Sequence, residues 1–182
     1  MPWAIFNRPS IQLGALKSYI RAHDQSIEVV ARHPYLDVAG RIGFDAYRII
    51  SEDSWAGEAL YCALLFPELR KKAASVFSCS LGRKAASTLP DFDRLCDQLD
   101  EQLDQWLEEH DFSGISLAGL TVCFGQLPAS LLVSRRLKLK YPDVKIVLGG
   151  STCIPETASS LLRVFPDLDY IISGEGERPL LE

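Results

Sequence analysis

The second half of the chain alternates short apolar runs with amphipathic segments. The apolar runs cover residues 114–122, 144–150 and 168–177, and residues 127–142 and 155–166 between them have helical periodicity. The runs are nearly continuous rather than alternating, which is typical of strands buried on both faces of a parallel sheet. This half is therefore predicted to be β–α–β–α–β with short links.

The amino-terminal part adds two more predicted strands. Residues 3–7 are a short apolar run stopped by Arg8-Pro9, and residues 26–33 are β-branched and bounded by Pro34. Residues 10–24 between them have a helical period that Ser10 could cap. We therefore expect a doubly wound α/β fold with a parallel five-stranded sheet. Its strands are predicted near 3–7, 27–32, 115–121, 145–149 and 169–173.

Residues 34–88 interrupt this alternation. The segment 54–78 is helix-forming and strongly apolar on one face, and Pro67 inside it predicts a break. We expect an inserted group of helices over about 34–88. The clearest helix pattern covers 89–111, where leucines recur at spacings of three and four and Asp91 lies in the first turn.

Composition narrows the classes of protein without identifying one. The 182 residues are 47% hydrophobic and carry a formal net charge of −5, which predicts one domain over 1–182 and gives no reason to expect a nucleic-acid partner. No apolar run reaches the roughly 18 residues of a membrane span, and we expect no membrane partner. Five scattered cysteines without a CxxC pair, and no secretory signal, favour reduced thiols in the cytoplasm and no metal site. The three histidines are equally scattered and are interpreted as surface residues.

Polar or glycine-bearing loops follow the predicted strands at residues 7–14, 121–128, 149–153 and 173–179. In a parallel sheet the carboxyl ends of the strands share one edge, where ligands bind. A single such loop commonly does no more than end a strand, but four would form a contiguous rim. None is GxGxxG or GxxxxGK[ST], so a dinucleotide or P-loop site is poorly supported. The glycine pair at 149–150 better fits a flat or bulky group against a strand end.

The sequence also resembles a known family. It is similar to the N-terminal region of cobalamin-binding radical S-adenosylmethionine (SAM) proteins, most closely the subgroup associated with maturation of ribosomally made, post-translationally modified peptides. The similarity covers nearly the whole chain. The segments that carry it are PSIQLGALK, SWAGEALYCALLFPE, LTVCFGQLPASLLVSRRLK, VLGGSTC and DYIISGEGERPLLE.

The resemblance implies a cobalamin site at the strand ends. The nucleotide tail would lie against Gly149 and Gly150, and we expect Gly150→Leu to block it without disturbing the fold. Residues 9–14 stand where many relatives carry DxHxxG, but Pro9 and Ile11 replace the Asp and the His. Cobalamin is therefore expected base-off, without a histidine ligand. The expected cofactor-binding residues are Ser10, Gln12, Gly14, Thr121, Val122, Cys123, Phe124, Gln126, Gly149, Gly150, Ser151, Gly174, Glu175, Gly176 and Glu177.

The chain lacks the CxxxCxxC spacing that holds a radical-SAM [4Fe–4S] cluster. We therefore expect SAM and the cluster only in a catalytic domain outside this chain, no catalytic residue within it, and contact with a precursor peptide through the full-length enzyme. The expected function is the cobalamin-binding N-terminal domain of a radical SAM peptide-modifying enzyme, with methyl transfer as its reaction. The first alternative is a corrin-free peptide-docking or scaffold domain that uses the helices of 54–88. The second is a small flavodoxin-like enzyme, for which no nucleophile–base pair is visible.

Overall fold

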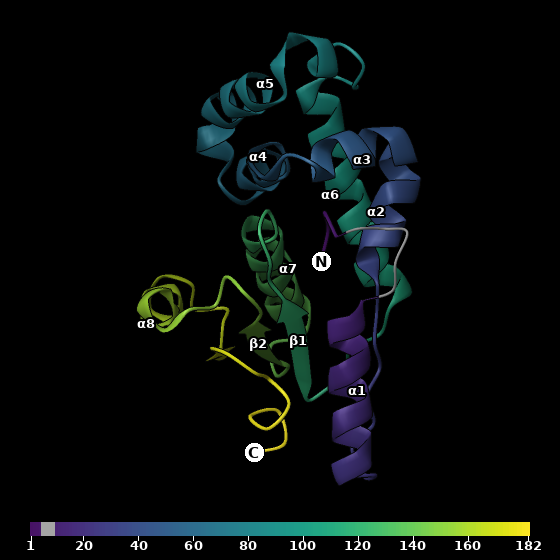
Figure 1. The fold of residues 1–182 in the computed structure, drawn as a ribbon, viewed down its shortest axis with the longest axis vertical. Helices are drawn as coiled ribbons and strands as arrows, with labels where there is room; N and C mark the ends of the chain where they lie inside the picture. The colour runs from purple at the N-terminus through teal and green to yellow at the C-terminus, as the bar shows by residue number, and fades with distance from the viewer. Residues whose placement is uncertain (5–9) are drawn as a thin grey trace.

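The structure is a computed structural model that describes residues 1–4 and 10–182, with the side chains of 83–86 left out of the description. Its fold is mixed α/β, mostly helical, with a small parallel sheet (Figure 1). The elements in chain order are α1 (Ile11–His23), α2 (Pro34–Ile42), α3 (Phe44–Ser51), α4 (Ser54–Leu65), the 3₁₀ turn η1 (Pro67–Leu69), α5 (Arg70–Ala86), α6 (Phe92–Glu109), β1 (Leu117–Thr121), α7 (Leu127–Lys140), β2 (Lys145–Gly149), α8 (Pro155–Val164) and β3 (Tyr170–Ile172).

The sheet has three strands in the order β1-β2-β3, all parallel. Thr121 of β1 pairs with Gly149 of β2, and Gly149 pairs with Ile172 of β3, so the three strands end level with one another. The middle strand buries Ile146 and Leu148 completely, as its continuous apolar run predicts. The coarser prediction, parallel strands joined by helices in the second half of the chain, is confirmed.

The predicted five-stranded, doubly wound sheet is not confirmed. The prediction of a strand over 27–32 is wrong, because residues 26–33 lie outside every helix and strand and leave Val30 about half exposed. β-branched residues favour a strand only where a neighbouring strand and a covered face are available, and none of the described strands pairs with this segment. The predicted strand 3–7 begins in a turn at Trp3 and Ala4, and its residues 5–7 lie outside the described residues.

Helices α2 to α6 form a layer beyond the carboxyl ends of the strands (Figure 1). Helix α4 is its centre and packs against α3, α5, α6 and α7, which is why it is apolar around most of its circumference. Asp53 caps it by accepting the backbone N–H of Ala56 at 2.8 Å. The break predicted at Pro67 is confirmed, because α4 ends at Leu65 and a 3₁₀ turn separates it from α5.

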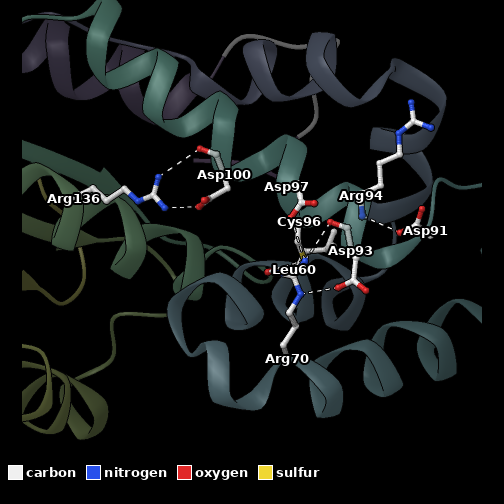
Figure 2. A network of polar contacts seen from close by, with 9 residues as sticks. All are labelled: Leu60, Arg70, Asp91, Asp93, Arg94, Cys96, Asp97, Asp100 and Arg136. Carbon is white, nitrogen blue, oxygen red and sulfur yellow. Dashed lines mark hydrogen bonds and ion pairs between the residues drawn. The ribbon is translucent and has the colours of Figure 1, made fainter.

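Helix α6 connects the helical layer to the layer that holds the sheet. Its leucine stripe is buried as predicted, with Leu95 and Leu99 fully enclosed. Its acidic face is paired on two sides (Figure 2): Arg70 of α5 donates to Asp93 at 2.6 Å, and Arg136 of α7 pairs with Asp100. Each such surface pair contributes little stability, but together they fix α6 against both α5 and α7.

Candidate functional site

The exits of β1 and β2 are joined by backbone hydrogen bonds. The N–H of Val122 donates to the carbonyl of Gly149 at 2.7 Å, and the N–H of Thr152 donates to the carbonyl of Val122 at 3.3 Å. Ile172, the last residue of β3, pairs with Gly149 in the sheet register. Three of the four predicted loops therefore follow strands that end at one edge of the sheet; of the fourth, 7–14, the structure describes only residues 10–14.

Gly150 is required by the fold itself. Its φ is +125°, and a Cβ there would lie 2.4 Å from the carbonyl oxygen of Val122 and 2.9 Å from its nitrogen. The group that a side chain at this position would meet is therefore the neighbouring backbone. This corrects the expectation that Gly150→Leu leaves the fold undisturbed. Gly149 differs, because a Cβ there would only touch Ile172 at 3.9 Å.

The loop after β1 is closed by the start of the chain. Gln126 is buried, and its side-chain oxygen accepts the backbone N–H of Cys123 at 2.9 Å. Its amide nitrogen donates to the carbonyl of Met1 at 3.3 Å. Phe124 lies in the same loop and is 82% exposed, whereas Val122 is completely buried. On this side the predicted rim is already packed.

Residues 1–4 fill a slot between this loop and helices α3 and α4. The Trp3 ring lies 5.3 Å from the ring of Tyr47 and 5.9 Å from that of Tyr61, measured between centroids. A Cβ on Gly57 of α4 would lie 2.7 Å from Trp3 Cδ1, so only glycine leaves room for the indole. The hydroxyl of Tyr47 donates to the carbonyl of Ala4 at 2.7 Å. Sequence reasoning missed this contact, although a glycine inside an apolar helix is a signal of close packing.

Burial shifts the pKa of several groups on this side. Burial lowers the pKa of the Met1 amine to about 6, although the nearby Cys123 opposes the shift. Burial also raises the pKa of Glu58, which a hydrogen bond from the backbone of Gly125 partly offsets. The pKa of the Cys153 thiol is raised by burial and by Cys123. Burial around the loop after β1 therefore favours the neutral forms of these three groups.

The side between β2 and β3 is more open. Ser151, Gly174 and Glu175 are exposed, and a Cβ at Gly174 would meet nothing within 4 Å. The hydroxyl oxygen of Thr152 is buried and has no hydrogen-bond partner among the described residues. A buried, unpartnered hydroxyl is a group that a polar atom of a ligand could satisfy. Thr152 was missed as a site residue because nothing in the sequence distinguishes it from its neighbour Ser151.

The fourth predicted loop is the start of a helix. Ser10 caps α1, as predicted, by accepting the backbone N–H of Leu13 at 3.3 Å, while Gln12 and Gly14 are exposed in its first turn. The hydrogen bonds of these three residues stay within the first turn of α1. One link to the segment after β3 lies a turn further on, where a Cβ at Gly176 would lie 3.5 Å from Leu16. Glu177, beside it, is half-buried.

These observations test how well cobalamin fits. The edge offers an unpartnered hydroxyl at Thr152, whose backbone N–H bonds Val122 at the exit of β1, and an open glycine at Gly174. On the β1 side, Val122 and Gln126 are buried and residues 1–4 lie against Gln126. Cobalamin therefore fits the edge in part while residues 1–4 are in place.

Metal-ligand groups, membrane-spanning helices and similar proteins are three further sources of evidence on function. Among residues 1–4 and 10–182, no three His, Cys, Asp or Glu side chains gather where they could hold a metal ion. None of the described helices has the length and apolarity needed to cross a bilayer. Comparison with family models, curated proteins and solved structures finds no match to the chain. The candidate site therefore rests on its own geometry.

Proposed function

We propose that this chain is the cobalamin-binding domain of a radical SAM peptide-modifying enzyme. One observation carries the proposal: the three parallel strands end level, with the exits of β1 and β2 joined by hydrogen bonds between Val122 and Gly149. Open parallel sheets bind their ligands at this edge. The family resemblance of the sequence supplies the class of ligand.

The chain's own residues would bind and position the cofactor. Thr152 would hydrogen-bond a polar group of cobalamin, with Ser151 beside it, and Gly174 would let the ligand approach the backbone after β3. When bound, cobalamin supplies a cobalt that can carry a methyl group. SAM, the [4Fe–4S] cluster and the precursor peptide would belong to a catalytic domain outside this chain, in the cytoplasm.

The cobalt is proposed to have no protein nitrogen ligand. Two of the histidine rings point back onto their own helices: Nδ1 of His23 lies 2.9 Å from the carbonyl of Tyr19, and Nδ1 of His110 lies 2.8 Å from that of Trp106. Electron paramagnetic resonance of the Co(II) form tests this, because an axial nitrogen gives a three-line splitting. A splitting that is lost when His23 or His33 is replaced would contradict the proposal.

Titration of the purified protein with hydroxocobalamin tests the binding itself. We expect saturable one-to-one binding that Thr152→Val weakens about 2- to 10-fold, the loss typical of one hydrogen bond. Thr157→Val makes the same change on α8, where the hydroxyl bonds only the carbonyl of Ile154, and should bind as the wild type. No binding at cobalamin concentrations well above that of the protein would overturn the proposal.

A corrin-free docking domain is the second candidate, and one observation favours it. A shallow hollow of about 420 Å³ lies on α4 and α5 and is lined by Trp55, Lys72, Val76 and Cys79. Trp55 is 64% exposed there, which is unusual for so large an apolar side chain. A peptide bound in the hollow would shift the fluorescence of Trp55. Such a shift in a protein that fails to bind cobalamin would favour this candidate.

A further inference from the structure

Residues 1–4, which we call the N-terminal plug, are held by three separate contacts. Gln126 donates to the carbonyl of Met1, Tyr47 donates to the carbonyl of Ala4, and the Trp3 ring lies in the space left by Gly57. Met1 and Trp3 are both buried. These contacts come from α3, α4 and the loop after β1, so the slot is built by parts of the chain far apart in sequence.

The docked plug also has features that oppose docking. Trp3 has a φ of +65°, a conformation that costs energy for any residue with a side chain. The N–H of its indole ring is buried and has no hydrogen-bond partner among the described residues. The Met1 amine is buried away from water. Favourable packing and unfavourable polar burial thus oppose each other in residues 1–4. Such a balance is expected of a segment that has both a docked and a released state.

The plug borders the β1 side of the edge at which open parallel sheets bind their ligands. Gln126, its anchor, also holds Cys123 in the loop that leaves β1. Figure 1 places the amino terminus just beyond the end of β1, below α3 and α4. We propose that the plug closes the β1 side of the ligand edge and leaves its slot when cobalamin binds there. This inference rests on the proposed function, because cobalamin is the ligand with which it is tested.

Gly57→Ala is the variant that tests the plug without altering it. The added Cβ would lie within 3.0 Å of three atoms of the Trp3 ring, so the docked position of the ring is disfavoured and the ring must shift. Alanine also suits a helix better than glycine, so α4 itself should hold. Gly40→Ala is the matched control, because Gly40 lies in α2 and a Cβ there meets nothing within 4 Å.

Two readouts are needed, in full-length protein whose intact mass shows that Met1 is present. The first is the rate at which an amine-reactive ester labels Met1, with the exposed Lys72 as internal reference. The second is the dissociation constant for hydroxocobalamin. We expect Gly57→Ala to raise the labelling rate at least about tenfold and to lower the apparent dissociation constant for cobalamin by a similar factor. The apparent dissociation constant equals the intrinsic constant divided by the fraction of protein whose plug has left its slot. Gly40→Ala should change neither.

The outcomes separate this inference from the proposed function. Faster labelling of Met1 with unchanged cobalamin affinity would overturn the plug as a gate and leave the function standing. No cobalamin binding by any variant would overturn the function, and the inference with it. If Gly57→Ala fails to fold by circular dichroism, Trp3→Gly replaces it, because glycine accepts a φ of +65° and removes the ring. The same gain in labelling and affinity is expected of that variant.

Discussion

At Gly150 two backbone segments approach more closely than any side chain would allow. The left-handed φ and the contact with Val122 are independent reasons for glycine, and both come from the join between β1 and β2. Gly174 has only the first reason, because its φ is +91° and its surroundings are open. A substitution at Gly174 therefore tests backbone strain alone, whereas one at Gly150 tests strain and steric overlap together.

Gly150→Ala should therefore destabilise the protein by about 3 kcal/mol or more, as strain and overpacking add. Gly174→Ala should cost about 1 kcal/mol, from strain alone. Urea denaturation monitored by circular dichroism measures both. Equal losses at the two positions would show that Val122 moves aside and that the close approach does not matter.

The glycine pair also shows what one residue's sequence context can reveal. The run of residues 145–149 into two glycines predicts a strand end and a close approach, and both are present. What approaches is a backbone 28 positions away in sequence, at Val122. Sequence patterns describe local periodicity and carry no information about which distant segment fills a space.

Among the elements, β3 is joined to β2 by one carboxylate in addition to the pairing of the two strands. Asp169 accepts the backbone N–H of Ile146 at 2.8 Å and the ammonium of Lys138 at 2.7 Å, and its own N–H donates to the carbonyl of Ile146 at 3.0 Å. Burial would raise its pKa, but the hydrogen bonds from Lys138, Ile146 and Lys145 outweigh burial and lower the pKa. The charged form therefore stabilises the start of a strand of only three residues.

Asp169→Asn should cost about 2 kcal/mol at pH 7, the usual loss for a hydrogen-bonded charge. The pKa is lower in the folded protein, so the stabilisation is present above the unfolded value near 3.9 and is lost as pH falls through the folded pKa. The difference between wild type and variant in urea unfolding should therefore shrink from pH 7 to pH 3. Asp167→Asn is the control, because its pair with Arg135 is long, at 3.8 Å, and should contribute little. If the free energies of unfolding of wild type and Asp169→Asn differ by the same amount from pH 7 to pH 3, the stabilising role of the charged carboxylate is contradicted.

Elements with strong, uniform patterns were predictable from the sequence. The leucine stripe of α6 and the alternation that gives β1, α7, β2, α8 and β3 each follow from periodicity and from proline or glycine at the ends. The segment 26–33 has equally strong β-branched composition but forms no strand, and none of the strands in the described part of the chain pairs with it. Whether a partner is present depends on the tertiary structure, which composition does not determine.

The whole molecule consists of a helical layer placed at the carboxyl ends of a small sheet, and the chain start lies between them. The Met1 amine is the charged group most affected by this arrangement. Its pKa falls from 8.0 to about 6 because the folded protein buries it. The stability of the entire fold should therefore depend on pH near neutrality.

Between pH 6 and 8 the unfolded chain holds more protons on this amine than the folded protein does, so the free energy of unfolding rises with pH. A shift of two pKa units corresponds to about 2–3 kcal/mol across that window, with little change outside it. Urea midpoints from pH 5.5 to 8.5 measure the rise. Trp3→Gly should remove most of it by releasing the amine, while the side chains of Glu58 on α4 and Cys123 in the loop after β1 are kept. Identical slopes in the two proteins would rule out the amine as the cause.

The hydrogen bond from Gln126 to Met1 also bears on how the protein is made. It joins residues 125 positions apart, so Met1 emerges long before its partner has been synthesised. At 5–20 residues per second, a ribosome needs roughly 6–25 s to add the intervening chain. During that interval the carbonyl of Met1 lacks its partner, although Tyr47, Gly57 and Tyr61, which pack against the Trp3 ring, have already been made. Trp3 can therefore be packed well before Met1 is anchored.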